Sequence, residues 1–560
     1  MKTIYILFAC VVLPHFLLAQ AQNPDSSSNN ASLAAEVKAL REALLQTQKQ
    51  MAAQQDEIEA LKVNSSRNAE AGSAAASSPA PSSLEPTVPF SSANVQQASS
   101  LQGDQETGKP QESPLGSIKL GDAVLDLGGF VDFENIFRTT NTQSNLATPF
   151  GTIPYNNTPQ GRVTELRTTA QFSRLSLKVT DSFKGNHVIG YVEGDFSGND
   201  APNVYQSVSG HTYRLRLYFG DLKRGKWEFL GGQTWSWLTP NRNGIGPMPA
   251  DLAITYNEDQ NLGIGIPYTR AAEFRVSYHA NNHWAMGVGI EGANQFIGSY
   301  VALPAAFTSI GSQFDNGAQI GAPNYFPDLL SKVTYDRDFA GRHFHAEATG
   351  LFTGAHASVK PIGQDSFRTR TAVGGGGQVA ANYDLTPKLT LLANAFWSNG
   401  GAHYLVATGP QLVVRPNAAG NDVRLSMVHA GAGSAGLEWR PSEKDAFAVY
   451  YAADYFGRNF FPDTSDTANP GTIIGFGGPG SPNTNNRAIQ QVTLDWLKTL
   501  WKNRRYGALQ FYTQYSYLTR APWYVAPGSP KDAHLSMVYL GFRYNLPTTS
   551  GTLLRLPYPD

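Results

Sequence analysis

The chain has 560 residues, and its 43 Lys and Arg nearly balance its 44 Asp and Glu, for a formal net charge of −1. This balance argues against a nucleic-acid binder, because neutralising phosphates requires a surplus of Lys and Arg. Charged residues are only 16% of the chain, whereas aromatic residues are 11% and Gly occurs 54 times, a composition typical of a large strand-rich protein with interfacial aromatic side chains and tight turns.

Residues 1–21 have the pattern of a secretory signal peptide. Lys2 is followed by an apolar run, and Ala19-Gln20-Ala21 supplies small residues for cleavage. The single cysteine, Cys10, lies inside this segment, so the mature chain is predicted to contain no disulfide. After residue 21 no run of eighteen apolar residues occurs, and we therefore predict no membrane-spanning helix.

Residues 22–62 are predicted to form a periplasmic helical coiled-coil segment. Apolar residues recur in alternating steps of four and three, and no Gly or Pro interrupts the helix formers between them. The seam contains Leu33, Val37, Leu40, Leu44, Met51, Ile58 and Leu61, with Thr47 and Gln54 as polar members. A solvated single helix is the alternative, but the segment has no partner for its apolar stripe within the chain, which favours self-association.

Residues 63–117 are rich in Ser, Ala, Pro and Gln and contain few aromatic residues. Such a composition cannot bury enough apolar surface to fold, so this segment is predicted to be a disordered linker. About fifty flexible residues span on the order of 40 Å, so the helix and linker together could reach well into a periplasm.

Residues 118–560 are predicted to form one all-β domain. The stretch from Gly121 to Arg138 is the first strand, and strands of about ten residues follow it, separated alternately by long polar connections and short turns. The long connections are expected near 139–162, 198–211, 238–268, 295–327, 354–374, 399–424, 457–487 and 519–534. Together with seven short turns they give sixteen strands. This predicts a 16-stranded antiparallel transmembrane β-barrel; a β-sandwich or propeller would not require strict alternation of loop length.

Period-two alternation assigns the two faces of several strands. Leu175, Leu177 and Val179 are expected to face lipid, with Arg174 on the other face. Between 213 and 219, Leu215, Leu217 and Phe219 are expected outward and Arg214, Arg216 and Tyr218 inward. Between 274 and 279, Arg275 is expected inward, and between 509 and 517 the inward residues are Gln510, Tyr512, Gln514 and Ser516. A polar lumen of sixteen strands is too wide for side chains to fill, which indicates a water-filled pore.

The sequence resembles the DcaP-like outer-membrane porins over nearly the whole mature chain. The resemblance rests on GGFVDFENIFRT, TTAQFSRLSLKVTD, GYVEGDF, RLRLYFGDLKRGKWEFLGGQTWS and the last strand VYLGFRYNLP, with the heptad segment in front. Membership would imply a trimer of sixteen-stranded barrels in the outer membrane of a Gram-negative-type bacterium and uptake of small anionic solutes such as dicarboxylates through an arginine-bearing constriction. The tail at 547–560 departs from the pattern, because the usual terminal aromatic residue is not last.

The candidate anion-binding residues are Arg174, Arg214, Arg216 and Arg275, which lie on predicted neighbouring strands. Arginine presents a permanent charge and a planar fork suited to carboxylates, and rings of such cations select anions in pores. Arg214 and Arg216 are expected roughly 6 to 7 Å apart along the strand, a spacing that could engage both ends of a dicarboxylate. The alternative is that each is a solvated or salt-bridged lumen residue. In porins the third long loop commonly folds inward to narrow the channel; the corresponding connection here carries both Arg242 and the acids Asp251, Glu258 and Asp259, so no charge sign is assigned to it.

Three other groups of residues do not match a known catalytic or metal-binding pattern. His343, His345 and Glu347 share one strand face, but alternate residues spread over roughly 13 Å, too far for one metal ion. Glu193 and Asp195 are paired carboxylates without a glycosidase context, and Gly374–Gly377 lacks the Lys and Ser/Thr of a phosphate loop. We predict no enzyme, no catalytic residue, no metal and no cofactor. The partners expected are small anionic solutes, outer-membrane lipid, a homotrimer and, through the coiled coil, the cell wall.

Two further functions are compatible with the sequence. One is a nonselective general or sugar porin, in which the arginines only set the field of the lumen. The other is an envelope-tethering protein, in which the helical segment binds a cell-wall partner and the barrel is an anchor.

Overall fold

The computed structural model describes residues 117–143, 148–198, 212–246, 264–292, 294–298, 301–316, 322, 324–405 and 409–547. The predicted signal peptide, the coiled-coil segment, the linker up to residue 116 and the tail from 548 lie outside these residues. In the part of the chain that is described, no helix is long and apolar enough to cross a membrane.

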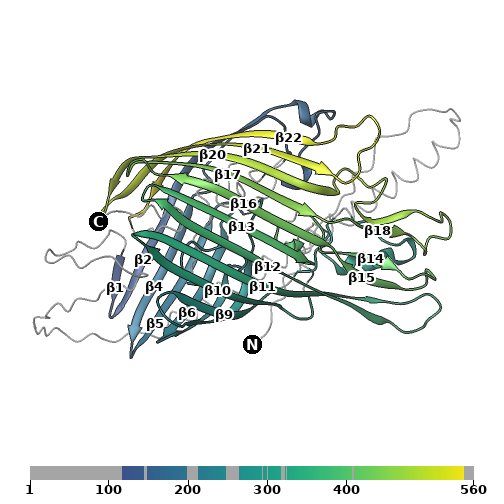
Figure 1. The fold of residues 1–560 in the computed structure, drawn as a ribbon, viewed down its shortest axis with the longest axis horizontal. Helices are drawn as coiled ribbons and strands as arrows, with labels where there is room; N and C mark the ends of the chain where they lie inside the picture. The colour runs from purple at the N-terminus through teal and green to yellow at the C-terminus, as the bar shows by residue number, and fades with distance from the viewer. Residues whose placement is uncertain are drawn as a thin grey trace, which may run out of the picture. The chain divides into compact units, whose positions relative to one another are not determined.

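The described residues form an antiparallel sheet that closes on itself (Figure 1). Its wall strands are β2 (Ala123–Arg138), β3 (Glu165–Thr169), β4 (Arg174–Phe183), β5 (Asn186–Asp195), β6 (Arg214–Arg224), β7 (Trp227–Trp235), β8 (Arg270–His279), β9 (Trp284–Glu291), β10 (Asp328–Phe339), β11 (Arg342–Val359), β12 (Arg368–Thr386), β13 (Leu389–Asn399), β16 (His429–Trp439), β17 (Asp445–Phe456), β20 (Asn486–Asn503), β21 (Gly507–Pro522) and β22 (Ala533–Asn545). Because β3 and β4 both pair with β2 and follow one another as one interrupted strand, the described wall has sixteen strands, which confirms the predicted barrel.

The barrel closes between its first and last wall strands. β22 pairs antiparallel with β2 from Phe130↔Asn545 to Arg138↔Met537. The strand β1 (Ser117–Leu120) pairs only with the start of β2 and adds a short extension beside it. Closure matters because an open sheet edge would leave backbone N–H and C=O groups unpaired, which lipid does not tolerate.

The connections alternate in length, as predicted. Two of the short turns, Lys184-Gly185 and Ala340-Gly341, place both residues at positive φ, the geometry of the hairpin turn that matches strand twist. The long connections carry short helical turns and hairpins of their own: η1 (Phe150–Thr152), η2 (Gln160–Arg162), η3 (Ala305–Gln313), η4 (Ala402–Tyr404), β14 (Leu412–Pro416) with β15 (Val423–Met427), and β18 (Asn459–Pro462) with β19 (Ile473–Phe476). In Figure 1 the labels β14, β15 and β18 lie beyond the wall, at what we call the long-loop end.

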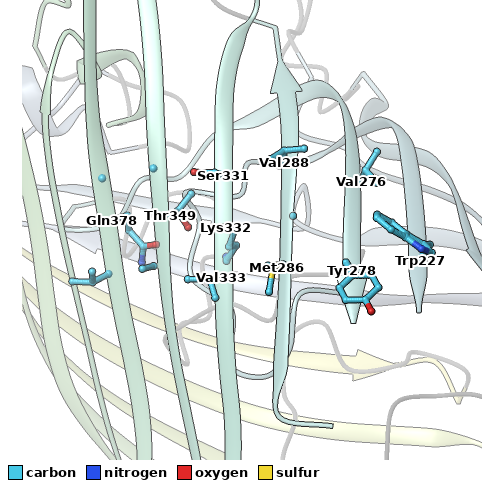
Figure 2. Close-up of a pocket in the computed structure, with 15 residues that line it drawn as sticks. Trp227, Val276, Tyr278, Met286, Val288, Ser331, Lys332, Val333, Thr349 and Gln378 are labelled. Carbon is cyan, nitrogen blue, oxygen red and sulfur yellow. The ribbon is translucent and has the colours of Figure 1, made fainter. Parts of the chain in front are cut away.

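The wall strands present an apolar outward face, and many of their inward side chains are polar. On β22, Val538, Leu540 and Phe542 are exposed, whereas the alternate residues Tyr539 and Arg543 are buried. The outward face also bears an apolar hollow of about 750 Å³ across β7 to β12 (Figure 2). An apolar outward band is what a barrel wall needs in lipid, where a Lys or Arg near the midplane costs about 2 to 4 kcal/mol.

Apolar side chains from the long connections pack together at the long-loop end. The larger cluster includes Phe150, Trp237 and Phe461 from three different connections, and its members are almost fully buried. A second cluster joins η3 to the hairpin of β14 and β15. The barrel mouth is therefore covered by folded connections that bury their own apolar residues.

The predicted connection at 354–374 is wrong, because β11 continues to Val359 and β12 already begins at Arg368. Ala355, Ala357 and Val359 pack against η3 and the β14–β15 hairpin, so the long connections cover these apolar side chains. Gly374–Gly377 also lies within β12. A Cβ at Gly374 would fall 2.0 Å from the carbonyl oxygen of Asn399, so the glycine permits close approach of β13.

Candidate functional site

The third long connection, between β7 and β8, folds into the barrel and is held there by wall carboxylates. The backbone N–H of Trp237 donates to Glu291 of β9 (3.0 Å), and that of Asn241 donates to Glu347 of β11 (3.1 Å). The N–H of Gly244 donates to both carboxylate oxygens of a third wall acid, Asp336 of β10, at 3.1 and 3.2 Å. These hydrogen bonds come from three positions along the connection and end on three different wall strands, so they hold the connection inside the barrel.

The same connection reaches the far side of the wall. Arg242 forms an ion pair with Glu438 of β16, and the amide of Asn382 on β12 donates to the carbonyl of Arg242 (3.2 Å). After the part that is not described, the N–H of Gly265 donates to Asp454 of β17 at 2.8 Å. The described parts of the third connection therefore cross the lumen and narrow it.

One buried cation and one histidine complete this anchoring network. Lys332 of β10 pairs with Glu347 at 2.9 Å and donates to the carbonyl of Trp237 at 3.0 Å. His345 lies between Asp336 (2.7 Å) and Glu347 (3.3 Å). Within the described residues, no group of His, Cys, Asp or Glu side chains is arranged to hold a metal ion. The histidine that shares a strand face with Glu347 thus belongs to the loop anchor.

A neighbouring connection is fixed to the same wall by a tyrosine. Tyr404 of η4 donates its hydroxyl to Asp328 (2.9 Å) and Glu291 (3.2 Å). Burial raises the pKa of Tyr404 well above its usual range, and the two nearby carboxylates act in the same direction. The phenol therefore remains protonated and serves as a donor.

Three of the four predicted arginines form one cluster around two carboxylates. Arg174 of β4 lies 3.3 Å from Glu193, Arg216 donates to Glu193 (3.1 Å) and Asp195 (2.8 Å), and Arg214 binds Asp195 with two nitrogens at 2.7 and 3.0 Å. We call these five residues the arginine cluster. Three guanidinium groups and two carboxylates leave it with one net positive charge. The side chain of Arg216 is 1% exposed, whereas that of Arg214 is 31% exposed, so Arg214 is the member that a solute in the lumen can meet.

Arg275, the fourth predicted arginine, belongs to a different part of the lumen. It lies 3.4 Å from Glu273 on its own strand and donates to the carbonyl of Gly246 on the third connection at 3.4 Å. Its guanidinium also lies over the ring of Trp237 at 5.4 Å. Its contacts place it at the base of the third connection, apart from the arginine cluster.

The predicted facing of β6 is wrong beyond Arg216. Glu193 pairs with Leu217 and Gly194 pairs with Leu215, so Arg216 is an extra residue in a β-bulge. After the bulge the alternation inverts: Leu217 and Phe219 are buried and Tyr218 is exposed. The two inward apolar side chains pack with Tyr191, Leu230 and Trp235, a cluster that forms inside the wall beside the arginines. The bulge brings both Arg214 and Arg216 to the same carboxylate.

Sequence reasoning missed the wall acids Glu291, Asp336, Glu438 and Asp454, which bind the third connection. Glu291 and Glu438 are the only acids in strands made mostly of apolar and small residues, a signal that indicates an inward group with a specific partner, whereas Asp336 lies among other charged residues of β10. Their partners are backbone N–H groups and one arginine far away in the sequence. Only the closed barrel brings them together.

No protein-family model matches the sequence, and no curated protein sequence matches it. Among solved structures, the chain is similar to the outer membrane channel DcaP of Acinetobacter baumannii, with a TM-score of 0.51 and 18% identity over 77% of this chain and 100% of that chain. It is also similar to OmpF of Salmonella typhi in complex with daunomycin (TM-score 0.42, 12% identity, 77% and 99% coverage) and to OmpT of Vibrio cholerae (0.40, 11%, 77% and 99%). The described chain therefore shares the barrel fold of the outer membrane channel DcaP.

Proposed function

We propose that this protein is an outer-membrane porin through which small anionic solutes, dicarboxylates among them, diffuse passively past the arginine cluster. The observation that carries the proposal is Arg214: it is the partly exposed member of a cluster with one net positive charge, inside a barrel narrowed by its third connection. We assign no catalytic activity and no cofactor to it.

The outward face of the barrel wall supports a location in the outer membrane. An apolar outward band on a closed sheet suits a bilayer, and the secretory signal peptide predicted at 1–21 suits export to the outer membrane of a Gram-negative-type bacterium. In such barrels the short turns lie in the periplasm and the long loops outside the cell. The predicted coiled-coil segment before the barrel would then lie in the periplasm, where it could hold a homotrimer together and contact the cell wall.

A solute that binds only weakly at the arginine cluster can continue through the channel. Arg214 already shares Asp195 with Arg216, so an incoming carboxylate exchanges with an internal partner and is not held by a bare cation. Conduction requires sites that bind strongly enough to admit a solute and weakly enough to release it. Partial neutralisation by Asp195 is consistent with such a site.

The test is a reversal-potential measurement in planar bilayers with chloride and a panel of dicarboxylates of different length. We expect the wild type to prefer anions and Arg214→Gln to lose dicarboxylate flux more than chloride conductance. Arg370→Gln is the matched control, because Arg370 pairs with Asp422 at the long-loop end, away from the lumen cluster. If the wild type shows no preference for anions, the proposed selectivity is wrong, and only the proposal that the protein is a channel remains.

A nonselective general porin is the second candidate. It is favoured by the same ion pairs, because Arg174, Arg214 and Arg216 each contact a carboxylate. In that case the cluster orders the inner wall, and Arg214→Gln would leave ion selectivity unchanged.

A further inference from the structure

A hollow of about 580 Å³ lies at the long-loop rim of the wall, where β13 ends and β15 packs beside β12. Its polar lining consists of Thr371, Asn399, Ser426, His429, Arg458 and Asn459. Val373 also lines it and is 59% exposed, on the strand face that carries the outward residues of β12. The hollow therefore opens toward the outside of the barrel, above the apolar band.

Two basic side chains are held at this hollow by aromatic rings. The guanidinium of Arg458 lies over the rings of Trp523 (5.3 Å) and Phe460 (5.7 Å). The ring of His429 stacks on Trp397 at 6.0 Å. Both basic side chains are exposed, and none of the described residues that line the hollow is Asp or Glu. The site thus presents positive charge without the internal carboxylates that neutralise the lumen arginines.

The neighbouring aromatic side chains place the hollow at the level of lipid headgroups. Trp397 lies 6.0 Å from Tyr455, which in turn lies 6.0 Å from Trp523, so three rings follow one another along the rim. Trp and Tyr concentrate where the hydrocarbon core meets the headgroups. A basic hollow beside such a row faces the headgroup region of one leaflet.

Uncharged polar groups extend the recognition surface. The amide of Asn459 donates to Ser426 (2.9 Å) and to the carbonyl of Met427 (3.0 Å), which fixes the floor of the hollow. The side-chain oxygen of Asn399 is buried and accepts no hydrogen bond from the described residues, so it can accept one from a ligand hydroxyl. A guanidinium and an imidazole for a phosphate therefore lie beside an acceptor for a hydroxyl.

We propose that this hollow binds the phosphorylated sugar headgroup of an outer-leaflet glycolipid, with Arg458 and His429 on the phosphate and Asn399 on a sugar hydroxyl. The inference rests on the outer-membrane location given above, and it is independent of what passes through the lumen. Bound lipid would brace the rim, because the lining comes from β12, β13, β15, β16 and the connection after β17.

The test measures lipid retention by the purified, folded full-length chain, using native mass spectrometry with lipid A as the probe. Dephosphorylated lipid A and inorganic phosphate are the comparison ligands. We expect the wild type to retain lipid A, and Arg458→Gln with His429→Gln to bind it about tenfold more weakly, as expected for the loss of charge-assisted hydrogen bonds. The matched control is Arg424→Gln, an exposed arginine on β15 that does not line the hollow.

Three results would overturn the proposal: equal retention by the double variant, equal retention of the dephosphorylated lipid, or displacement of lipid A by inorganic phosphate at equal concentration. Single-channel conductance of the same preparations separates this site from the channel. Lipid retention by a protein that does not conduct would reject the porin proposal and support the lipid site.

Discussion

Arg242 of the third connection forms an ion pair with Glu438 of β16, on the far side of the lumen from the strand at which that connection begins. β7 is the fifth wall strand and β16 is the twelfth, so the pair spans the barrel interior. Glu438 is fully buried and also accepts from Arg440 (3.0 Å) and from the hydroxyl of Tyr450 (2.8 Å). This carboxylate is one of two anchors, with Asp454 of β17, that hold the third connection at the far wall.

Glu438→Gln should loosen the third connection while keeping the shape of the side chain. A hydrogen bond between charged groups contributes about 1.5 to 3 kcal/mol, and the variant leaves Arg242 without its carboxylate. We expect larger and noisier single-channel conductance in planar bilayers. Glu443→Gln, in the exposed turn after β16, is the control. Conductance and noise equal to those of the wild type would show that this anchor does not set the width of the lumen.

Arg214 and Arg216 should differ in their effect on stability. Arg216 is buried between Glu193 and Asp195, so Arg216→Gln leaves two buried carboxylates with less compensation, at a cost of about 3 to 5 kcal/mol. Arg214 is partly exposed, and its pair is screened by solvent, so Arg214→Gln should cost about 1 kcal/mol or less.

The measurement for this pair is the temperature at which the folded band converts to the unfolded band in detergent gels. We expect a clear decrease for Arg216→Gln and a small one for Arg214→Gln. Equal decreases would mean that the exposure difference between the two arginines does not determine their energetic roles.

The barrel was predictable because lipid outside and water inside impose a period of two on every wall strand. The same argument placed Arg174 and Arg275 inward. It failed after Arg216, at Leu217 to Phe219, because one extra residue in a bulge inverts the alternation that follows, and no residue in that stretch marks the bulge. The partners of the arginines could not be predicted either, since an ion pair depends on register between strands.

The coiled-coil prediction falls outside the described residues and remains to be tested on the full chain. Leu40→Asp with Leu44→Asp places two charges in the predicted seam, which should abolish helix association. We expect the proposed homotrimer to dissociate in mild detergent, as measured by analytical ultracentrifugation, while the barrel stays folded. Asp substitution of Ala39 and Gln46, which lie outside the seam, is the control. A trimer that survives the seam substitution would show that the barrels associate without the helix.

Gly129 should be essential for barrel closure, because it combines two constraints at one position. Its φ is +124°, a conformation that side chains rarely adopt, and a Cβ there would lie 2.1 Å from the carbonyl oxygen of Arg174 on the neighbouring strand. The backbone strain alone costs about 1 to 3 kcal/mol. The clash would also push β4 away from β2, next to the place where β2 pairs with β22 and closes the barrel. Gly129→Ala should therefore reduce the fraction of chain that reaches the folded, heat-modifiable form.

Gly220→Ala is the matched control for this closure test, since no described atom lies within 4 Å of a Cβ at that position and its φ is not positive. Both variants add one methyl group to the same sheet, so a difference between them reflects the two constraints at Gly129, its positive φ and the close approach of β4. The measurement is the folded fraction in unheated detergent gels of outer-membrane extracts. If both variants fold as well as the wild type, β2 and β4 can separate at this point without opening the barrel.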